Sequence, residues 1–162
     1  MLRFAGMQPL VIRGSTPATA DAAQLIAALN AELKAMFPEP GANHFSLSEE
    51  QVNGSNGAFL VAYLDNVPVG CGAVRRLDAS TAELKRMYVD PSVRGHGIGQ
   101  ALVKALEREA RLLGVTRIVL ETGTRLTRAV KLYETMGYAR IPLFGEYVET
   151  PDTSLCLGKS LV

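Results

Sequence analysis

The stretch Val93-Arg94-Gly95-His96-Gly97-Ile98-Gly99-Gln100-Ala101-Leu102-Val103 alternates three glycines with other residues just before a long apolar period. That period occupies positions 98, 101, 102, 105, 106, 110 and 113, which form one face of a helix, and Gly114 stands where a C′ glycine would end it. Upstream, residues 82–89 are rich in strand-forming residues and are followed by Asp90-Pro91. The sequence therefore predicts a strand, a glycine loop and a helix in succession.

The start of such a helix is a binding site for anions. It exposes unpaired backbone N–H groups at the positive end of the helix dipole, and glycine lets a phosphate approach the backbone closely. The spacing excludes a P-loop, because Gln100-Ala101 follows Gly99 where Lys and Ser or Thr are required. It also excludes the dinucleotide pattern G-x-G-x-x-G, which fails when counted from Gly95 and from Gly97.

The pattern that fits is Arg-x-x-Gly-x-Gly, formed by Arg94, Gly97 and Gly99. It resembles the pyrophosphate loop of bacterial members of the GCN5-related N-acetyltransferase (GNAT) superfamily, which follows the fourth strand and binds coenzyme A. The resemblance implies acetyl-CoA as co-substrate. The residues that it implies for cofactor binding are Met87, Tyr88, Val89, Arg94, Gly95, His96, Gly97, Ile98, Gly99 and Gln100.

A second motif extends the resemblance. Residues 129–134, Ala-Val-Lys-Leu-Tyr-Glu, followed by Gly137-Tyr138, are similar to the GNAT motif A-x-x-(L/F)-Y-x-x-x-G-(F/Y). Residues 83–91 resemble the fourth strand of many bacterial members, so the likeness spans roughly residues 59–157. One position departs from it, because Leu126 stands where the family often carries an Asn that reaches the pantetheine arm.

Length and composition indicate one globular domain. The chain has 162 residues, of which 48% are hydrophobic, and this excludes an intrinsically disordered protein. We expect a single acetyltransferase domain over residues 1–162, with an acceptor-side part at 1–57 and an acetyl-CoA-binding core at 58–162. A net charge of +1 indicates neither a nucleic-acid partner nor an anionic membrane.

The sequence favours a cytoplasmic protein. It has no apolar run long enough to cross a bilayer and no signal-peptide pattern at its N-terminus. Its two cysteines, Cys71 and Cys156, lie far apart and match no metal spacing. The oligomeric state is not encoded in any motif, and a homodimer is compatible with the sequence.

The predicted elements give an α/β fold in which a mostly antiparallel sheet is flanked by helices. Strands are expected at 9–13, 59–64, 67–76, 82–89, 117–121, 138–143 and 154–157, about seven in all. About four helices are expected: one capped by Thr19 or Asp21, a short one opening with the capping box Ser46-x-x-Glu49, one over 98–113, and one over 126–136. Residues 82–121 should form a βαβ unit with parallel strands.

Acetyl transfer to an amine needs a base, and Glu83 is the candidate, acting through water. An alkylamine with a pKa near 10.4 is only about one part in a thousand neutral at pH 7. The alternative is a surface glutamate paired with Lys85 or Arg86. By resemblance, the Tyr133 hydroxyl lies beside the coenzyme A sulfur and donates a proton to the leaving thiolate. Its alternative is an ordinary core tyrosine.

Other side chains receive weaker assignments. Arg94 is expected to serve the pyrophosphate, and the main chain of residues 87–89 to hold the carbonyl oxygen and pantetheine. Cys71, between two glycines, allows a covalent acyl-cysteine route that we consider unfavourable, since no His flanks it. His44 and His96 are single histidines that belong to no metal-ligand pattern in the sequence, so no metal is assigned.

The acceptor is the least defined part. Candidates to line its site are Arg75, Arg76, Phe45 and residues 144–147. The favoured function is an N-acetyltransferase that moves acetyl directly to a primary amine of a small molecule or amino-acid-like acceptor. A protein lysine or N-terminus is the second acceptor class. A non-catalytic acetyl-CoA sensor is the alternative outside enzymes.

Overall fold

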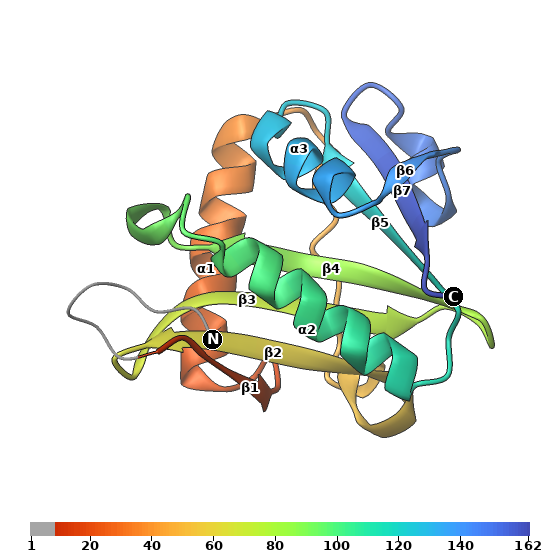
Figure 1. Ribbon diagram of the computed structural model, residues 1–162. Helices are drawn as coiled ribbons and strands as arrows, with labels where there is room; N and C mark the ends of the chain where they lie inside the picture. Colours follow the sequence, from red (N-terminus) through yellow and green to blue (C-terminus); the bar gives the residue numbers. More distant parts are fainter. Residues whose placement is uncertain (1–8) are drawn as a thin grey trace.

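The computed structural model describes residues 9–162, which form one seven-stranded sheet with helices on both faces (Figure 1). The strands are β1 (Val11–Ser15), β2 (Gly57–Leu64), β3 (Val67–Arg76), β4 (Thr81–Val89), β5 (Arg117–Gly123), β6 (Ala139–Ile141) and β7 (Ser154–Ser160). Their order across the sheet is β1-β2-β3-β4-β5-β7-β6. Only the β4–β5 pair is parallel, so the predicted α/β fold with a mostly antiparallel sheet is confirmed.

Three α-helices pack on this sheet: α1 (Ala20–Met36), α2 (Ile98–Leu112) and α3 (Thr127–Thr135). Helix α1 covers one face, and α2 and α3 cover the other (Figure 1). Short 3₁₀ turns occupy η1 (Glu50–Val52), η2 (Gly54–Asn56), η3 (Pro91–Val93) and η4 (Gly145–Glu149). The face under α2 holds the larger of the two hydrophobic clusters.

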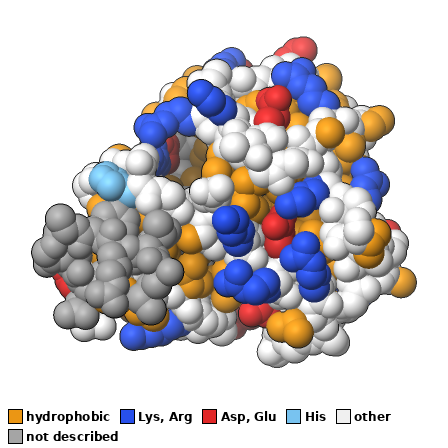
Figure 2. All heavy atoms as spheres, viewed as in Figure 1, with side chains coloured by type: hydrophobic (Ala, Val, Ile, Leu, Met, Phe, Trp, Pro, Cys, Tyr) orange, Lys and Arg blue, Asp and Glu red, His pale blue; other side chains and the backbone are white. Residues whose placement is uncertain are grey.

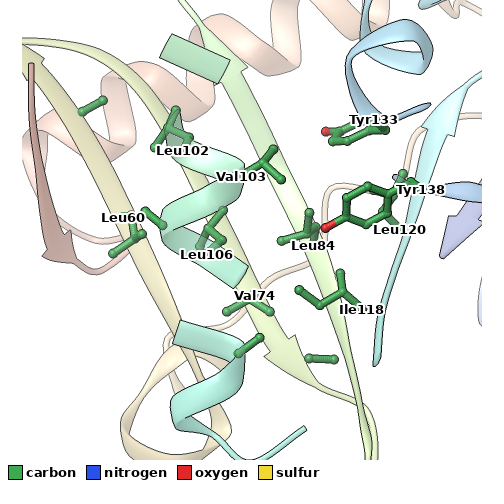
Figure 3. Packing of buried hydrophobic residues seen from close by; sticks show 14 of the residues in the cluster. Leu60, Val74, Leu84, Leu102, Val103, Leu106, Ile118, Leu120, Tyr133 and Tyr138 are labelled. Atoms are coloured by element: carbon green, nitrogen blue, oxygen red, sulfur yellow. The ribbon is translucent and has the colours of Figure 1, made fainter. Parts of the chain in front are cut away.

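Helix α2 anchors the larger cluster, as its apolar period predicts. Leu102, Val103 and Leu106 are fully buried against β2, β3 and β4, and Figure 3 shows them pointing into the sheet toward Leu60, Val74 and Leu84. Gly114 follows the helix with φ +82°, a left-handed conformation that glycine adopts without strain. The predicted helix and its stop signal are therefore both confirmed.

The predicted hairpin and the α1 cap are also confirmed. Asp65 and Asn66 join β2 to β3 with φ 49° and 63°, the pair of left-handed residues that a tight type I′ turn requires. At the start of α1, the Thr19 side chain accepts a hydrogen bond from the Ala22 N–H. Asp21, the other predicted cap, instead accepts a hydrogen bond of 2.7 Å from the Tyr63 hydroxyl.

The fourth predicted helix is wrong. Residues 46–48 form no helix, and Glu49 makes no side-chain cap. A reciprocal capping box does form two residues later: the Ser48 N–H donates to Gln51 Oε1 and the Gln51 N–H donates to Ser48 Oγ. This capping box precedes only the single 3₁₀ turn η1, because no long amphipathic period follows it in the sequence. Residues 9–162 thus contain three α-helices, not four.

Strands β4 and β5 pair at only one end. Their parallel register runs from Thr81 beside Arg117 to Leu84 beside Leu120, and no pair is formed beyond it. Past this point β4 is bulged against β3: the register shifts opposite Gly72, and Arg86 has φ +59°. A Cβ at Gly72 would collide with the Met87 sulfur, so any larger residue there would have to displace the Met87 side chain. The two strands therefore diverge beyond Leu84 and Leu120.

No helix within residues 9–162 combines the length and the apolar character needed to cross a bilayer. We also predict that the N-terminus has no signal-peptide pattern. That prediction includes residues 1–8, which lie outside the described part of the chain.

Candidate active site

A cleft of about 510 Å³ opens between the start of α2, the end of β4, α3 and α1. In the space-filling view this face of the molecule is hollowed, with Lys and Arg side chains near the opening (Figure 2). Nine of the ten predicted cofactor-binding residues line the cleft: Met87, Tyr88, Val89, Arg94, Gly95, Gly97, Ile98, Gly99 and Gln100. The tenth, His96, is exposed in the same loop, and its Nδ1 lies 3.2 Å from the Val93 carbonyl oxygen.

The glycine loop and the first turn of α2 line one side of this cleft. Gly95 and Gly97 have φ 83° and 85°, conformations that side chains rarely adopt, and Gly97 is the N-cap of α2. The first-turn N–H groups of α2, at residues 98–100, have no partner within the helix, and these three residues line the cleft. At Gly99 the constraint is close packing against α3, since a Cβ there would lie 3.2 Å from the Leu132 side chain.

Arg94 lies at this cleft but is held by protein groups. Its Nε donates to the Val89 carbonyl oxygen at 2.8 Å, and its two terminal nitrogens each donate to a Glu32 carboxylate oxygen at 2.9 Å. The bidentate Glu32 pair raises the pKa of Arg94. Arg94 thus ties the glycine loop to β4 and to α1, and a role at a pyrophosphate stays a prediction.

Tyr133 stands where the cleft continues inward. It is buried on α3, and Figure 3 shows its hydroxyl directed toward β4. Burial, with a smaller effect of the Glu121 charge, raises the pKa of Tyr133 above its ordinary value. No side chain or carbonyl within residues 9–162 hydrogen-bonds this hydroxyl, so its proton is available to a ligand.

Beyond Tyr133 lies a second, smaller space of about 130 Å³, which we call the inner cavity. It occupies the gap left by the divergence of β4 and β5 and is closed by α1 and residues 42–44. The cleft and the inner cavity share six lining residues: Leu29, Leu33, Met87, Leu126, Ala129 and Tyr133. A ligand in the cleft can therefore meet a ligand in the inner cavity beside the Tyr133 hydroxyl.

Glu83 is not a surface residue. Its side chain is completely buried, and its partner is Arg75, at 2.9 Å from Nε and 2.8 Å from Nη2, and not Lys85 or Arg86. Its second carboxylate oxygen accepts a hydrogen bond of 2.5 Å from the Tyr147 hydroxyl. Glu83 is thus an anchored carboxylate behind the cavity wall, while Tyr147 lines the cavity itself.

Glu121 is a carboxylate that sequence reasoning missed. It lies on β5 and lines the inner cavity, and the only hydrogen bond it receives from the described residues comes from Ser154 Oγ at 3.1 Å. Burial raises its pKa to about 7, and the negative charge of Glu83 adds to that shift. A carboxyl group that titrates near neutrality beside a cavity is suited to accept a proton. No motif marks it, because β5 reads only as a short apolar strand.

The match to known families agrees with this geometry. A model described as the acetyltransferase (GNAT) family matches residues 24–138. The chain belongs to this family. It is a GNAT-type, acetyl-CoA-dependent N-acetyltransferase, as its two motifs predicted.

Two relatives and one solved structure illustrate the likeness. The chain is 34% identical over 156 residues to an IAA acetyltransferase of Azospirillum brasilense, covering 96% of this chain and 100% of that one. It is 38% identical over 104 residues to the N-acetylaspartate synthetase of Rattus norvegicus, covering 64% of this chain and 34% of that one. A crystal structure described as an acyl-CoA N-acyltransferase from Klebsiella pneumoniae has a TM-score of 0.79 and 30% identity, over 94% of this chain and 98% of that one.

The predicted acceptor residues of this acetyltransferase are only partly at the cavity. Tyr147 lines it, whereas Arg75 is bound to Glu83, and Arg76 donates to the carbonyl oxygens of Ser55 and Leu113. Phe45 lies under the Arg86 guanidinium, with 4.9 Å between its ring centroid and Cζ. The cations that do line the inner cavity are Lys85 and Arg86, which the sequence had suggested only as partners of Glu83.

Neither the cysteines nor the histidines form a reactive cluster. Cys71 is fully buried and donates its thiol hydrogen to the Arg86 carbonyl oxygen, and burial raises the pKa of this thiol to about 12. His44 pairs with Glu146 at 2.9 Å and with Thr150 at 3.0 Å. Within residues 9–162, no three His, Cys, Asp or Glu side chains are grouped as a metal site would require.

Proposed function

We propose that this GNAT enzyme transfers acetyl from acetyl-CoA directly to the primary amine of a small molecule. The observation that carries this proposal is the inner cavity, a small space lined by residues of α1, β4 and β5 and by residues 42–44, which meets the cleft at Tyr133. A space of about 130 Å³ accommodates an acceptor of a few heavy atoms, whereas a protein acceptor would need an open groove along the surface. Its junction with the cleft at Tyr133 supports transfer without a covalent enzyme intermediate.

The residues of the cleft fit the co-substrate. The free N–H groups at the start of α2 would bind pyrophosphate oxygens, and Gly97 keeps that approach clear of a Cβ. The unpaired edge of β4 at residues 87–89 would bind the pantetheine amides and the thioester carbonyl oxygen. Acetyl-CoA supplies an activated acetyl thioester. Leu126 can offer only apolar contact where the family often has an Asn.

Tyr133 is proposed as the proton donor. Its raised pKa keeps the hydroxyl protonated at neutral pH. Since a thiol titrates near 8.5 and is the stronger acid, complete proton transfer from Tyr133 to the thiolate is uphill, and Tyr133 acts by hydrogen-bonding the developing thiolate as the C–S bond breaks. The free hydroxyl at the junction of the two cavities supports that placement.

Two carboxylates are candidates for the base, and we propose that they divide the task. Glu121 meets the acceptor directly and takes the proton that the amine loses. Glu83 acts one step behind: it holds the Tyr147 hydroxyl at the cavity wall, and its charge raises the pKa of Glu121. Glu83 as the base itself, acting through Tyr147 or water, stays the competing assignment, and the pH profiles in the Discussion separate the two.

The names of the relatives agree with a small acceptor. One is an IAA acetyltransferase, and another is an N-acetylaspartate synthetase whose named product is an acetylated small amine with carboxylates. We take from them only the class, a small molecule, because the identities are 34% and 38%.

The test is release of free thiol from acetyl-CoA with a panel of small amines, amino acids and lysine-containing peptides. We expect turnover with at least one small amine and no faster reaction with any peptide. A peptide that outcompetes every small amine would move the assignment to the protein-acceptor class. Tight acetyl-CoA binding without turnover of any acceptor would favour the sensor.

A further inference from the structure

Arg86 is a buried cation with an unused donor. Its side chain is 7% exposed, and its Nε is the one buried side-chain nitrogen or oxygen within residues 9–162 that has no hydrogen-bond partner. One terminal nitrogen donates to Asn30 Oδ1, and the guanidinium lies over the Phe45 ring. No carboxylate of the described residues forms an ion pair with it. Buried charged groups in proteins are ordinarily paired with an opposite charge and fully hydrogen-bonded, and Arg86 is neither.

Lys85 is the second such cation, next to Arg86 in the bulge of β4. It is 7% exposed and makes no hydrogen bond or ion pair with the described residues. The charges that act on it are Glu83, Arg75 and Arg86 from the sheet and Glu146 from η4. Burial lowers its pKa, so that the site as it stands disfavours the charge. Both side chains line the inner cavity, and neither lines the cleft.

The bulge itself places these cations. Arg86 has φ +59°, a left-handed conformation that is rare for a side chain of this size and costs free energy. At the same bulge, the Met87 side chain occupies the space that a Cβ at Gly72 on β3 would need. Two consecutive cations thus line one small cavity, where a regular strand would send them to opposite faces of the sheet.

The opposite wall carries negative charge. Glu121 lines the inner cavity from β5, opposite the β4 residues Lys85 and Arg86 across the gap between the diverging strands. A ligand that satisfies both walls carries an anionic group and a cationic or hydrogen-bonding nitrogen within a short distance of each other. The small volume of the cavity limits that distance to a few bonds.

We propose that Arg86 and Lys85 form a subsite for the carboxylate of the acceptor, so that the acceptor is a small amino carboxylate. The inference rests on the proposed function for the amine, and on the geometry of the inner cavity for the carboxylate. The Arg86 guanidinium, which has no carboxylate partner among the described residues, pairs with the carboxylate, and Lys85 supplies a second charge. The amine then lies toward Glu121 and Tyr133, beside the opening to the cleft.

The phosphates of the co-substrate are a poor alternative for this subsite. Their proposed cradle is the start of α2, which lines the cleft and does not line the inner cavity. The cations at the cleft are Arg94, Arg125 and Arg128, a set separate from Lys85 and Arg86. The two anion sites therefore belong to different ligands.

The first experiment uses the unaltered protein and matched acceptors. Each amino acid of a panel is compared with its carboxamide, for example L-alanine with L-alaninamide and L-aspartate with L-aspartic diamide. The α-amine of the amide is less basic than that of the acid, so a larger fraction of it is neutral and able to react at pH 7. A preference for the acid must therefore come from the binding site. We expect kcat/KM to be about 10- to 100-fold higher for the preferred acid, the range for a charged hydrogen bond. Equal or faster reaction of the amides overturns the carboxylate subsite.

The second experiment assigns the preference to these residues. Arg86→Gln and Lys85→Met should each lower the acid-to-amide ratio of kcat/KM, and Arg108→Gln, the same exchange on the exposed face of α2, is the matched control. The rise in melting temperature with coenzyme A reports that each variant is folded. An unchanged ratio in both Arg86→Gln and Lys85→Met overturns the assignment, even if the parent prefers acids.

A binding measurement separates this inference from the proposed function. Succinate offers carboxylates and no amine, so calorimetry with succinate and with succinamide tests the subsite without turnover. We expect binding of succinate that Arg86→Gln weakens at least tenfold, and weaker binding of succinamide. If no amine is acetylated but succinate binds in this way, the proposed function fails and the anion subsite stands. If amines are acetylated but succinate and succinamide bind alike, the proposed function stands and the anion subsite fails.

Discussion

The cleft and the inner cavity meet at Tyr133, but they are assembled in opposite ways. The proposed anion cradle of the cleft comes from one continuous segment, residues 93–100, whose glycines set the backbone at the start of α2. The polar wall of the inner cavity combines His44, Lys85, Glu121 and Tyr147, which are far apart in the sequence. A site made of backbone N–H groups leaves a glycine pattern, whereas a site made of dispersed side chains leaves none. The following predictions test whether the two regions also divide the function.

The largest effect is expected from Tyr133→Phe, at the junction. The ring and its packing remain, and only the proton donor is removed. Since general acid catalysis typically contributes about 10²–10⁴-fold, kcat should fall on that scale, with acetyl-CoA affinity nearly unchanged. Single-turnover kinetics and a binding titration measure both quantities. A kcat within threefold of the parent would mean that Tyr133 is a packing residue.

The next effect concerns the two carboxylates and is measured as pH–rate profiles with one acceptor amine. Glu121 must be ionised to act, and its pKa is about 7, so the parent rate should rise through pH 7. Glu121→Gln should lose about 10²-fold just above pH 7, where Glu121 of the parent is ionised and the amine is still charged, and recover as pH approaches the pKa of the amine. Tyr133→Phe should show no such recovery.

Glu83→Gln should behave differently, because the negative charge of Glu83 raises the pKa of Glu121. Its removal should shift the acidic limb of the profile to lower pH while Glu121 still acts. If Glu83→Gln instead shows the larger loss and the recovery at high pH, Glu83 is the base, as the sequence suggested.

The same carboxyl group predicts a stability difference. Its pKa is raised from 4.5 to about 7 on folding, so it favours the folded state most below pH 4.5, and this contribution disappears as pH rises through 7. Glu121→Gln should therefore melt at or above the parent at pH 8, although it is less active. A clearly lower melting temperature at pH 8 would show that ionised Glu121 is stabilising.

A glycine pair tests the cleft. Gly97 and Gly114 stand at the two ends of α2 with φ 85° and 82°, so an alanine at either costs a similar 1–2 kcal/mol, roughly, of folding free energy. Only Gly97→Ala also places a Cβ in the cradle. It should raise KM for acetyl-CoA about tenfold and reduce the melting-temperature rise that acetyl-CoA causes. Equal acetyl-CoA binding by both variants would remove the cradle assignment.

The smallest effect is expected from Cys71→Ala. Direct transfer needs no thiol, and a thiol with a pKa of about 12 is a poor nucleophile at pH 7. Turnover should stay within about threefold of the parent, and mass spectrometry of the protein incubated with acetyl-CoA should find no acetyl-cysteine. An adduct at Cys71 would replace direct transfer by a covalent route.

The sequence by itself determined the parts that rest on local physics. The period of α2, the glycines at its two ends, the Asp65-Asn66 turn and the order of the elements each depend on neighbouring residues, and each could be predicted. The failed helix at Ser46 is the instructive exception. Its capping spacing was present, but a cap needs an amphipathic period after it to pack against the sheet, and none follows.

Only the tertiary structure decided what faces the acceptor. The divergence of β4 from β5 and the bulge at Arg86 place Lys85, Arg86 and Glu121 around one cavity, and they leave Arg75 paired with Glu83. No local pattern encodes these neighbours, since strand register and a bulge depend on the partner strands. A charge has the same sequence signature whether it is solvated or buried, and its chemistry is set by the groups that folding brings within reach of it.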